Sequence, residues 1–131
     1  METINIMLDG HPMVVCCNSK QKALVSDNAP HAHYCLNRAD VLADASAFKQ
    51  MCLSVQDVQS VLELFGGSGW HSSILRKVCE PKIHLVCDID EDCVNSIRYS
   101  LPDVHVVKMD SYELLKRYRN KSGGACWDWI H

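Results

Sequence analysis

Hydrophobic residues follow two periods along this chain, and the change from one to the other predicts a sheet covered by helices. Continuous apolar runs of strand length, bounded by turn residues, are typical of strands buried on both faces. Such runs occupy 58–64, 84–90, 104–111 and 125–131. Apolar residues at three- and four-residue spacing predict helices at 38–51, 70–78, 91–101 and 112–119. Strands that alternate with helices predict an α/β fold, with a parallel sheet of about four strands and helices on both faces.

The N-terminal region shows a different pattern, in which Ile4, Ile6 and Leu8 alternate with polar neighbours. Strict alternation is typical of a half-buried strand. The elements that follow are a turn at 9–12, a returning strand at 13–17, a turn at 18–21 and a candidate third strand at 22–25. We therefore predict an N-terminal β appendage at 1–28, placed before a Rossmann-like domain at 29–131.

The most informative stretch is 60–70, where an apolar run carries Glu63 near its end and three glycines precede a helix. Glycines here allow a tight turn and let backbone N–H groups approach a ligand, with the positive end of the helix dipole behind them. The turn lacks the Gly-Lys-Ser/Thr of a phosphate loop, and a G-x-G-x-x-G match would need a glycine at Ser72. A carboxylate before the glycines would repel a pyrophosphate and suits a ligand that carries positive groups.

Two further predicted strands carry acids at their ends, Asp88 and Asp110. The strand that leads to Asp88 begins about twenty residues after the glycines, the spacing at which an acid holds ribose hydroxyls in βαβ nucleotide sites. Asp90 is the better candidate for the N-cap of the next helix, because acids fill the first turn after it. For Asp110, a helix cap is the alternative interpretation.

In this order, the glycine turn and the three acids resemble the class I S-adenosylmethionine-dependent methyltransferases, from about Val58 to the end of the chain. The resemblance implies that Asp88 holds the ribose, Ile89 packs on the adenine and Asp110 faces its exocyclic amine. Phe65 stands where many small-molecule methyltransferases have their first glycine. With phenylalanine at this position, the motif resembles that of the DNA- and RNA-methylating branches. The S-adenosylmethionine-binding residues so implied are Glu63, Phe65, Gly66, Gly67, Gly69, Asp88, Ile89, Asp110 and Ser111.

The resemblance covers only the cofactor-binding half of the family pattern. In nucleic-acid amino-methyltransferases the fourth strand ends in a catalytic Asp/Asn-Pro-Pro-Tyr/Phe, whereas 127–131 reads Trp-Asp-Trp-Ile-His. We therefore expect the cofactor-binding part of a methyltransferase that acts on DNA or RNA, truncated before its catalytic motif. The alternative is a non-catalytic protein that sequesters S-adenosylmethionine or regulates a partner methyltransferase. The carboxylate at Glu63 argues against a nucleotide binder of another kind.

Charge and hydropathy bear on the partners. The formal net charge of −3 gives no broad electrostatic footprint for nucleic acid. A truncated sheet exposes an edge strand, and such edges favour a homo-oligomer or a partner subunit. No apolar stretch reaches the length of a membrane span, and the eight cysteines follow no Cys-x-x-Cys pattern, so we expect a cytoplasmic protein with reduced thiols.

Several residues have a simpler structural interpretation. His31, His33 and Cys35 resemble half of a metal site, but zinc needs a fourth ligand that the sequence does not fix, so we predict no metal. We expect Trp70 in the core and His71 facing solvent or capping its helix. Trp127 and Trp129 alternate on the last strand, so they should face opposite sides of the sheet.

Overall fold

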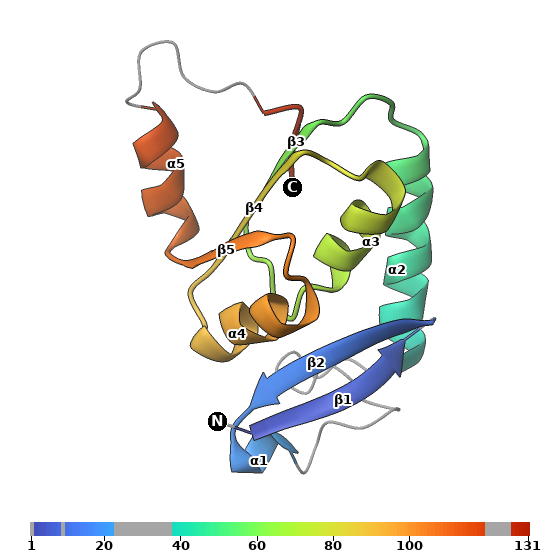
Figure 1. The fold of residues 1–131 in the computed structure, drawn as a ribbon, viewed down its shortest axis with the longest axis vertical. Coiled ribbons are helices and arrows are strands. Elements are labelled where there is room, and N and C mark those ends of the chain that lie inside the picture. Colours follow the sequence, from blue (N-terminus) through green and yellow to red (C-terminus); the bar gives the residue numbers. More distant parts are fainter. Residues whose placement is uncertain (1, 9, 23–37, 120–126) are drawn as a thin grey trace.

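The computed structural model describes residues 2–8, 10–22, 38–119 and 127–131, which form an α/β fold (Figure 1). Its centre is a parallel four-stranded sheet in the order β5-β4-β3-β6. The strands are β3 (Ser60–Glu63), β4 (Ile83–Asp88), β5 (His105–Lys108) and β6 (Trp129–Ile130). The predicted fold class is confirmed, because each buried apolar run of the sequence forms one strand of this sheet.

Helices cover both faces of the sheet. The helices are α2 (Arg38–Leu53), α3 (Trp70–Cys79), α4 (Glu91–Ser100) and α5 (Ser111–Arg119). Val61 of β3 packs with residues of α2 and α3, whereas its neighbour Leu62 packs with Leu114 of α5 on the opposite face. Val86 of β4 packs with Ile97 of α4. Successive residues of one strand thus serve two separate cores, as strands buried on both sides require.

The N-terminal segment forms the predicted antiparallel hairpin, β1 (Glu2–Leu8) with β2 (His11–Cys17). The hairpin lies against α4, because the N–H groups of Val14 and Cys16 each donate at 2.8 Å to the hydroxyl oxygens of Ser100 and Ser96. Its inward residues Ile6, Met13 and Val15 join the same hydrophobic cluster as α2 and α3. The hairpin therefore shares a core with the helices that surround the sheet.

Some local predictions were wrong. The predicted turn at 18–21 is part of a short helix, α1 (Ser19–Lys22), so Lys22 ends a helix instead of starting a third strand. Residues 23–25, which would complete that strand, lie outside the described residues. The spacing in 112–119 places both Leu114 and Leu115 inward, but only Leu114 is buried and Leu115 is exposed. In the preceding helix, α2, the spacing allows either Met51 or Cys52 to face inward, and Cys52 is the buried one.

The last described strand confirms one prediction about side-chain direction. Trp129 packs against the cluster of α2 and α3, and Trp127 packs against the cluster of α5.

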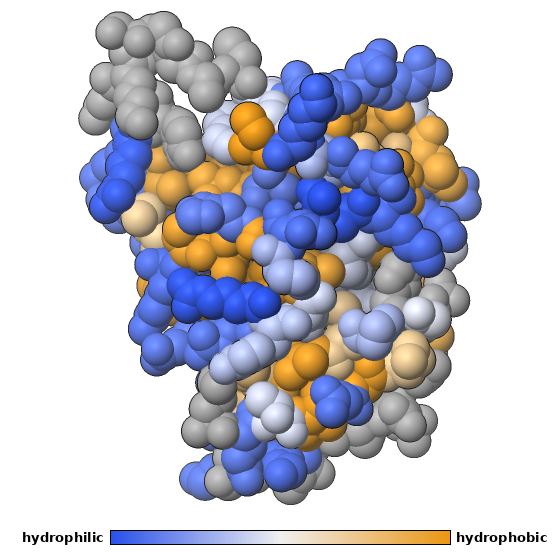
Figure 2. Space-filling model, viewed as in Figure 1, coloured by the Kyte–Doolittle hydropathy of each residue, from blue (hydrophilic) through white to orange (hydrophobic). Residues whose placement is uncertain are grey.

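β5 and β6 are the two edges of the described sheet. Hydrophobic residues gather over β4 and β5, between α5 and α4 (Figure 2). Among the described segments, no helix combines the length and the apolar character needed to cross a bilayer.

Candidate functional site

The glycine turn between β3 and α3 is shaped by close packing as much as by backbone conformation. A Cβ on Gly66 would lie 2.2 Å from Cγ1 of Val86, and the Gly66 N–H donates to the carbonyl of Cys87 at 2.9 Å. Gly67 and Gly69 have φ angles of 58° and 90°, which favour glycine. Phe65 also has a positive φ of 57° and is 78% exposed. Conformations of this kind in non-glycine residues cluster at functional sites.

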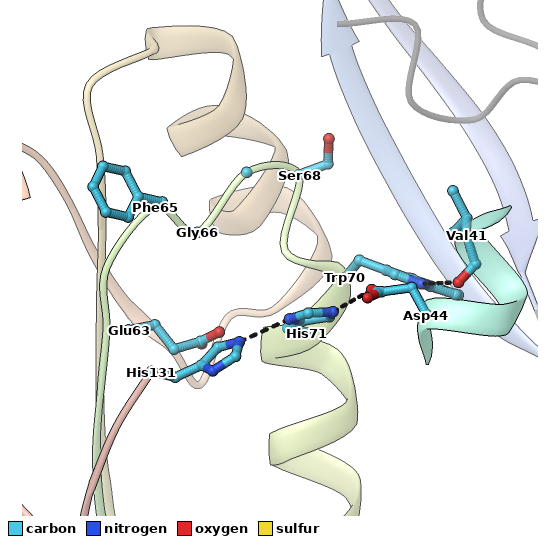
Figure 3. Close-up of a pocket in the computed structure, with 10 residues that line it drawn as sticks. Val41, Asp44, Glu63, Phe65, Gly66, Ser68, Trp70, His71 and His131 are labelled. Atoms are coloured by element: carbon cyan, nitrogen blue, oxygen red, sulfur yellow. Dashed lines mark hydrogen bonds and ion pairs between the residues drawn. The ribbon is translucent and has the colours of Figure 1, made fainter. Parts of the chain in front are cut away.

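A cavity of about 530 Å³, partly open to solvent, lies beneath this turn (Figure 3). It is at the carboxyl end of β3, where open α/β sheets bind their ligands. Of the residues predicted to bind a cofactor, only Glu63, Phe65, Gly66 and Gly67 line it. The rest of the wall was not predicted from the sequence and consists of Val41, Asp44, Ser68, Trp70, His71 and His131.

Glu63 is a buried acid with a buried partner. The residue is 1% exposed, and its Oε2 lies 2.5 Å from Nε2 of His84 on the neighbouring strand β4. Burying a carboxylate without a partner is costly, and His84 provides the hydrogen-bond partner that Glu63 needs. The other ring nitrogen of His84, Nδ1, is buried and has no hydrogen-bond partner among the described residues. The side chain of Glu63 is therefore held in place from the core side while it also lines the cavity.

Asp88 and Asp110 do not line the cavity. Both oxygens of Asp88 accept backbone N–H groups at 2.9 Å, Oδ2 from Gly67 and Oδ1 from Asp90. Asp110 is exposed, and its Oδ1 accepts the N–H groups of Tyr112 and Glu113 at 2.9 and 3.3 Å. The strand-end acids thus reach two different environments, one bracing the glycine turn and one capping α5.

The remaining predicted site residues are Ile89, Ser111 and Gly69. Ile89 follows β4 and is 67% exposed, and Ser111 is the first residue of α5. Gly69 is the N-cap residue of α3. Asp90 is the N-cap of α4, as predicted, because its Oδ1 accepts the N–H of Cys93 at 3.0 Å.

The prediction that His71 faces solvent or caps its helix was wrong. His71 is partly buried on the cavity wall, with Nδ1 2.8 Å from Nε2 of His131 and Nε2 2.5 Å from Oδ2 of Asp44. Both imidazole rings stack on Phe48, at centroid distances of 4.1 and 4.6 Å. Trp70 is in the core, as predicted, and its indole N–H donates to the carbonyl of Val41. Three separate elements therefore contribute to one polar chain.

Burial lowers the pKa of His131 from the ordinary value of 6.5, and the neighbouring His71 lowers it further. The carboxylates of Glu63 and Asp44 act in the opposite direction. The net result favours a neutral imidazole at the cavity wall, which is a hydrogen-bond acceptor at one of its nitrogens.

Within the described residues, no group of three or more histidine, cysteine, aspartate or glutamate side chains is arranged to hold a metal ion. His31, His33 and Cys35, the residues weighed for zinc, lie outside the described residues. None of the six described cysteines forms a disulfide, and five of them are buried.

The fold resembles that of a solved S-adenosylmethionine-dependent methyltransferase. A crystal structure of an S-adenosylmethionine-dependent methyltransferase from Agrobacterium tumefaciens matches 99% of this chain with a TM-score of 0.65 and 14% sequence identity. DesVI from Streptomyces venezuelae matches 70% of this chain and 35% of its own, with a TM-score of 0.46 and 23% identity. The chain spans 39% of the Agrobacterium protein. No protein-family model matches the chain, and no curated protein matches its sequence.

Proposed function

We propose that this chain is the S-adenosylmethionine-binding part of a methyltransferase that acts on DNA or RNA. The observation that carries the proposal is the buried carboxylate of Glu63 at the carboxyl end of β3, beside a glycine turn that opens onto the cavity. The likeness in fold to a solved S-adenosylmethionine-dependent methyltransferase supports it.

The ligand chemistry follows from the charges of the wall. S-adenosylmethionine carries an ammonium group and a sulfonium, and Glu63 and Asp44 place two carboxylates on the wall for such cations. A pyrophosphate would instead meet Glu63 as a like charge, which argues against a dinucleotide.

Asp88 contributes to the proposed site through the glycine turn. Its carboxylate fixes the N–H of Gly67, and Gly67 lines the cavity. A ribose hydroxyl would have to share or replace one of the two N–H groups that Asp88 now accepts. In the proposed complex Ile89, which is exposed beside it, packs on the adenine, while Asp110 and Ser111 approach the exocyclic amine from the start of α5.

Phe65 supports the nucleic-acid part of the proposal. The residue is 78% exposed at the rim of the cavity, and its positive φ is a conformation that costs a non-glycine residue about 1–3 kcal/mol. An exposed aromatic face can stack on a base, a contact worth about 1–3 kcal/mol. Because the net charge is −3, we expect weak binding to the phosphates of a target by this chain itself.

Ligand binding is tested by melting the purified chain with S-adenosylmethionine, S-adenosylhomocysteine or NAD. At about 100 times the dissociation constant a ligand adds about 2.7 kcal/mol to the free energy of unfolding, which corresponds to about 10 °C for a chain of 131 residues. Glu63→Gln should weaken binding about 10- to 100-fold, since it removes one charge-assisted hydrogen bond. Asp103→Asn, at an exposed acid far from the turn in sequence, is the matched control. A shift with NAD alone would refute the proposal.

The target class is tested by transfer of a labelled methyl group from S-adenosylmethionine to DNA, RNA and protein, each offered separately. We expect label in DNA or RNA that Phe65→Ala reduces without changing the affinity for S-adenosylhomocysteine by more than about twofold. Label found only in protein would contradict the nucleic-acid assignment and leave the cofactor assignment standing.

A further inference from the structure

The polar chain on the cavity wall joins three elements that are far apart in the sequence. Asp44 comes from α2, His71 from the first turn of α3, and His131 directly follows β6 (Figure 3). Two hydrogen bonds fix the backbone of His131: its N–H donates to Leu62 of β3 at 2.9 Å, and its carbonyl accepts from Leu64, directly after β3, at 2.7 Å. The strand pairing that builds the sheet thus also sets the distance between the two imidazole rings.

The positions of the protons on the two imidazole rings follow from the charge of Asp44. The Asp44 carboxylate only accepts hydrogen bonds, so Nε2 of His71 carries a proton. In neutral His71 the other nitrogen, Nδ1, is then an acceptor, and it takes the N–H of Nε2 of His131. The remaining nitrogen, Nδ1 of His131, keeps its lone pair. Among the described residues, no hydrogen-bond donor satisfies that lone pair.

The groups around His131 keep this lone pair available, and they can accommodate a proton that binds to it. Burial and the adjacent His71 lower the pKa of His131, so the ring is neutral before reaction, against the opposing effects of Glu63 and Asp44. Phe48 stacks on both rings and holds them in fixed orientations. A proton that arrives at Nδ1 of His131 can be matched by transfer of the Nε2 proton to His71, which places the positive charge next to Asp44.

We propose that His131 is the proton acceptor for methyl transfer to a nitrogen that bears hydrogen, with His71 and Asp44 as positioning residues. The inference rests on the proposed function and narrows its substrate to an amino or ring N–H group. The nitrogen lone pair forms a bond to the methyl carbon, the carbon–sulfur bond breaks and its electron pair stays on sulfur. The proton released from nitrogen moves to Nδ1 of His131, and the Nε2 proton of that ring moves to Nδ1 of His71.

The decisive experiment is nitrogen NMR of the chain labelled at histidine, because ring nitrogens with and without hydrogen are distinguished directly. Between pH 7 and 8 we expect His131 with hydrogen on Nε2 and none on Nδ1, and His71 with hydrogen on Nε2. A hydrogen on Nδ1 of neutral His131 would overturn the proposal. In that tautomer Nε2 of His131 accepts a hydrogen bond from His71 instead of donating one, and Nδ1 has no lone pair for a proton.

Asp44→Asn tests the charged end and is expected to fold, since the Asp44 side chain is 59% exposed. We expect the pKa of His131 to fall further in this variant, because the Asp44 carboxylate, which raises that pKa, loses its negative charge. His105→Gln, at an exposed histidine of β5, is the matched control and should leave both rings unchanged. An Asp44→Asn chain that titrates like the wild type would refute the role of Asp44.

The catalytic readout separates this inference from the proposed function. His131→Gln removes the acceptor, so we expect kcat to fall about 10²- to 10⁴-fold while the Kd for S-adenosylmethionine changes less than about threefold. Unchanged kcat in this variant would overturn the proposal even if S-adenosylmethionine binds. Failure of the wild-type chain to bind S-adenosylmethionine would instead overturn the proposed function and the inference with it. In either case, nitrogen NMR shows which ring nitrogens carry hydrogen, and therefore in which direction the hydrogen bonds run between Asp44, His71 and His131.

Discussion

Substituting Gly66 by alanine should strain the link between the glycine turn and the sheet. The new Cβ would lie 2.2 Å from Cγ1 of Val86 and 3.0 Å from Cδ1 of Ile97, whereas ordinary contacts begin near 3.4 Å. The turn or Val86 would therefore have to move by about 1 Å. Val86 is fully buried, so it has no free direction in which to move. The Gly66 N–H bond to Cys87 would be stretched by any movement of the turn.

Overpacking of this kind typically costs about 1–3 kcal/mol, which for a chain of this length lowers Tm by about 4–12 °C. Thermal and urea unfolding followed by circular dichroism measure the change. Because the turn also lines the cavity, we expect the Gly66→Ala chain to bind S-adenosylmethionine at least about tenfold more weakly than the wild type. The backbone of Gly66 has no positive φ, so the penalty is steric alone.

Two further variants separate the steric penalty from a general effect of replacing glycine. Gly10→Ala meets no atom within 4 Å but has a φ of 77°, so it should lose only about 1–2 kcal/mol from backbone strain and leave binding unchanged. Combining Gly66→Ala with Val86→Ala should cost at least about 1 kcal/mol less than the two single changes added together, because the new Cβ fills the space that Val86 leaves. Additive losses, or a Gly66→Ala chain as stable as the wild type, would refute this account of the turn.

Three further predictions concern stability. His84→Phe should cost about 3–5 kcal/mol in urea unfolding by leaving Glu63 buried without a partner, and adding Glu63→Leu should restore most of the loss. Asp90→Ala should cost about 0.5–2 kcal/mol by removing the cap of α4, whereas Asp90→Asn, which keeps a capping oxygen, should cost less. Because folding lowers the pKa of His131, its contribution to stability is present above about pH 6.5 and is lost as pH falls through the folded value. Urea unfolding from pH 8 to 5 should show this loss, and His131→Gln should reduce it.

The sequence predicts the sheet well because its information is local. Each strand is a short apolar run, and α3, α4 and α5 end near Pro81, Pro102 or a glycine pair as their turn residues indicate. The alternation of Val61 and Leu62 between two faces also follows from strand period alone. Predictions weaken where two neighbours compete for one buried position, as Met51 and Cys52 do, since periodicity does not decide which of them faces inward.

The acids show a different limit. Their position at strand ends is a property of the sequence, but the groups they bind depend on side-chain rotamers. Asp88 turns toward the N–H of Gly67, and Asp110 turns toward the start of α5, so two similar motifs give a braced turn and a helix cap. Both have backbone N–H groups within reach, and a carboxylate accepts these more readily than it stays unpaired. We therefore expect ligand binding at Asp88 to be coupled to the conformation of the glycine turn.

His71 was misjudged from the sequence because its partners are distant along the chain. Asp44 is 27 residues before it and His131 is 60 residues after it, and no local pattern connects them. Parallel pairing of β6 with β3 brings His131 to the cavity, while packing of α2 on α3 brings Asp44. Two independent contacts of the fold must therefore form before the chain Asp44–His71–His131 exists. Phe48→Ala removes the ring on which both imidazoles stack. We expect it to disrupt the hydrogen bonds that join Asp44, His71 and His131, although Phe48 forms none of them.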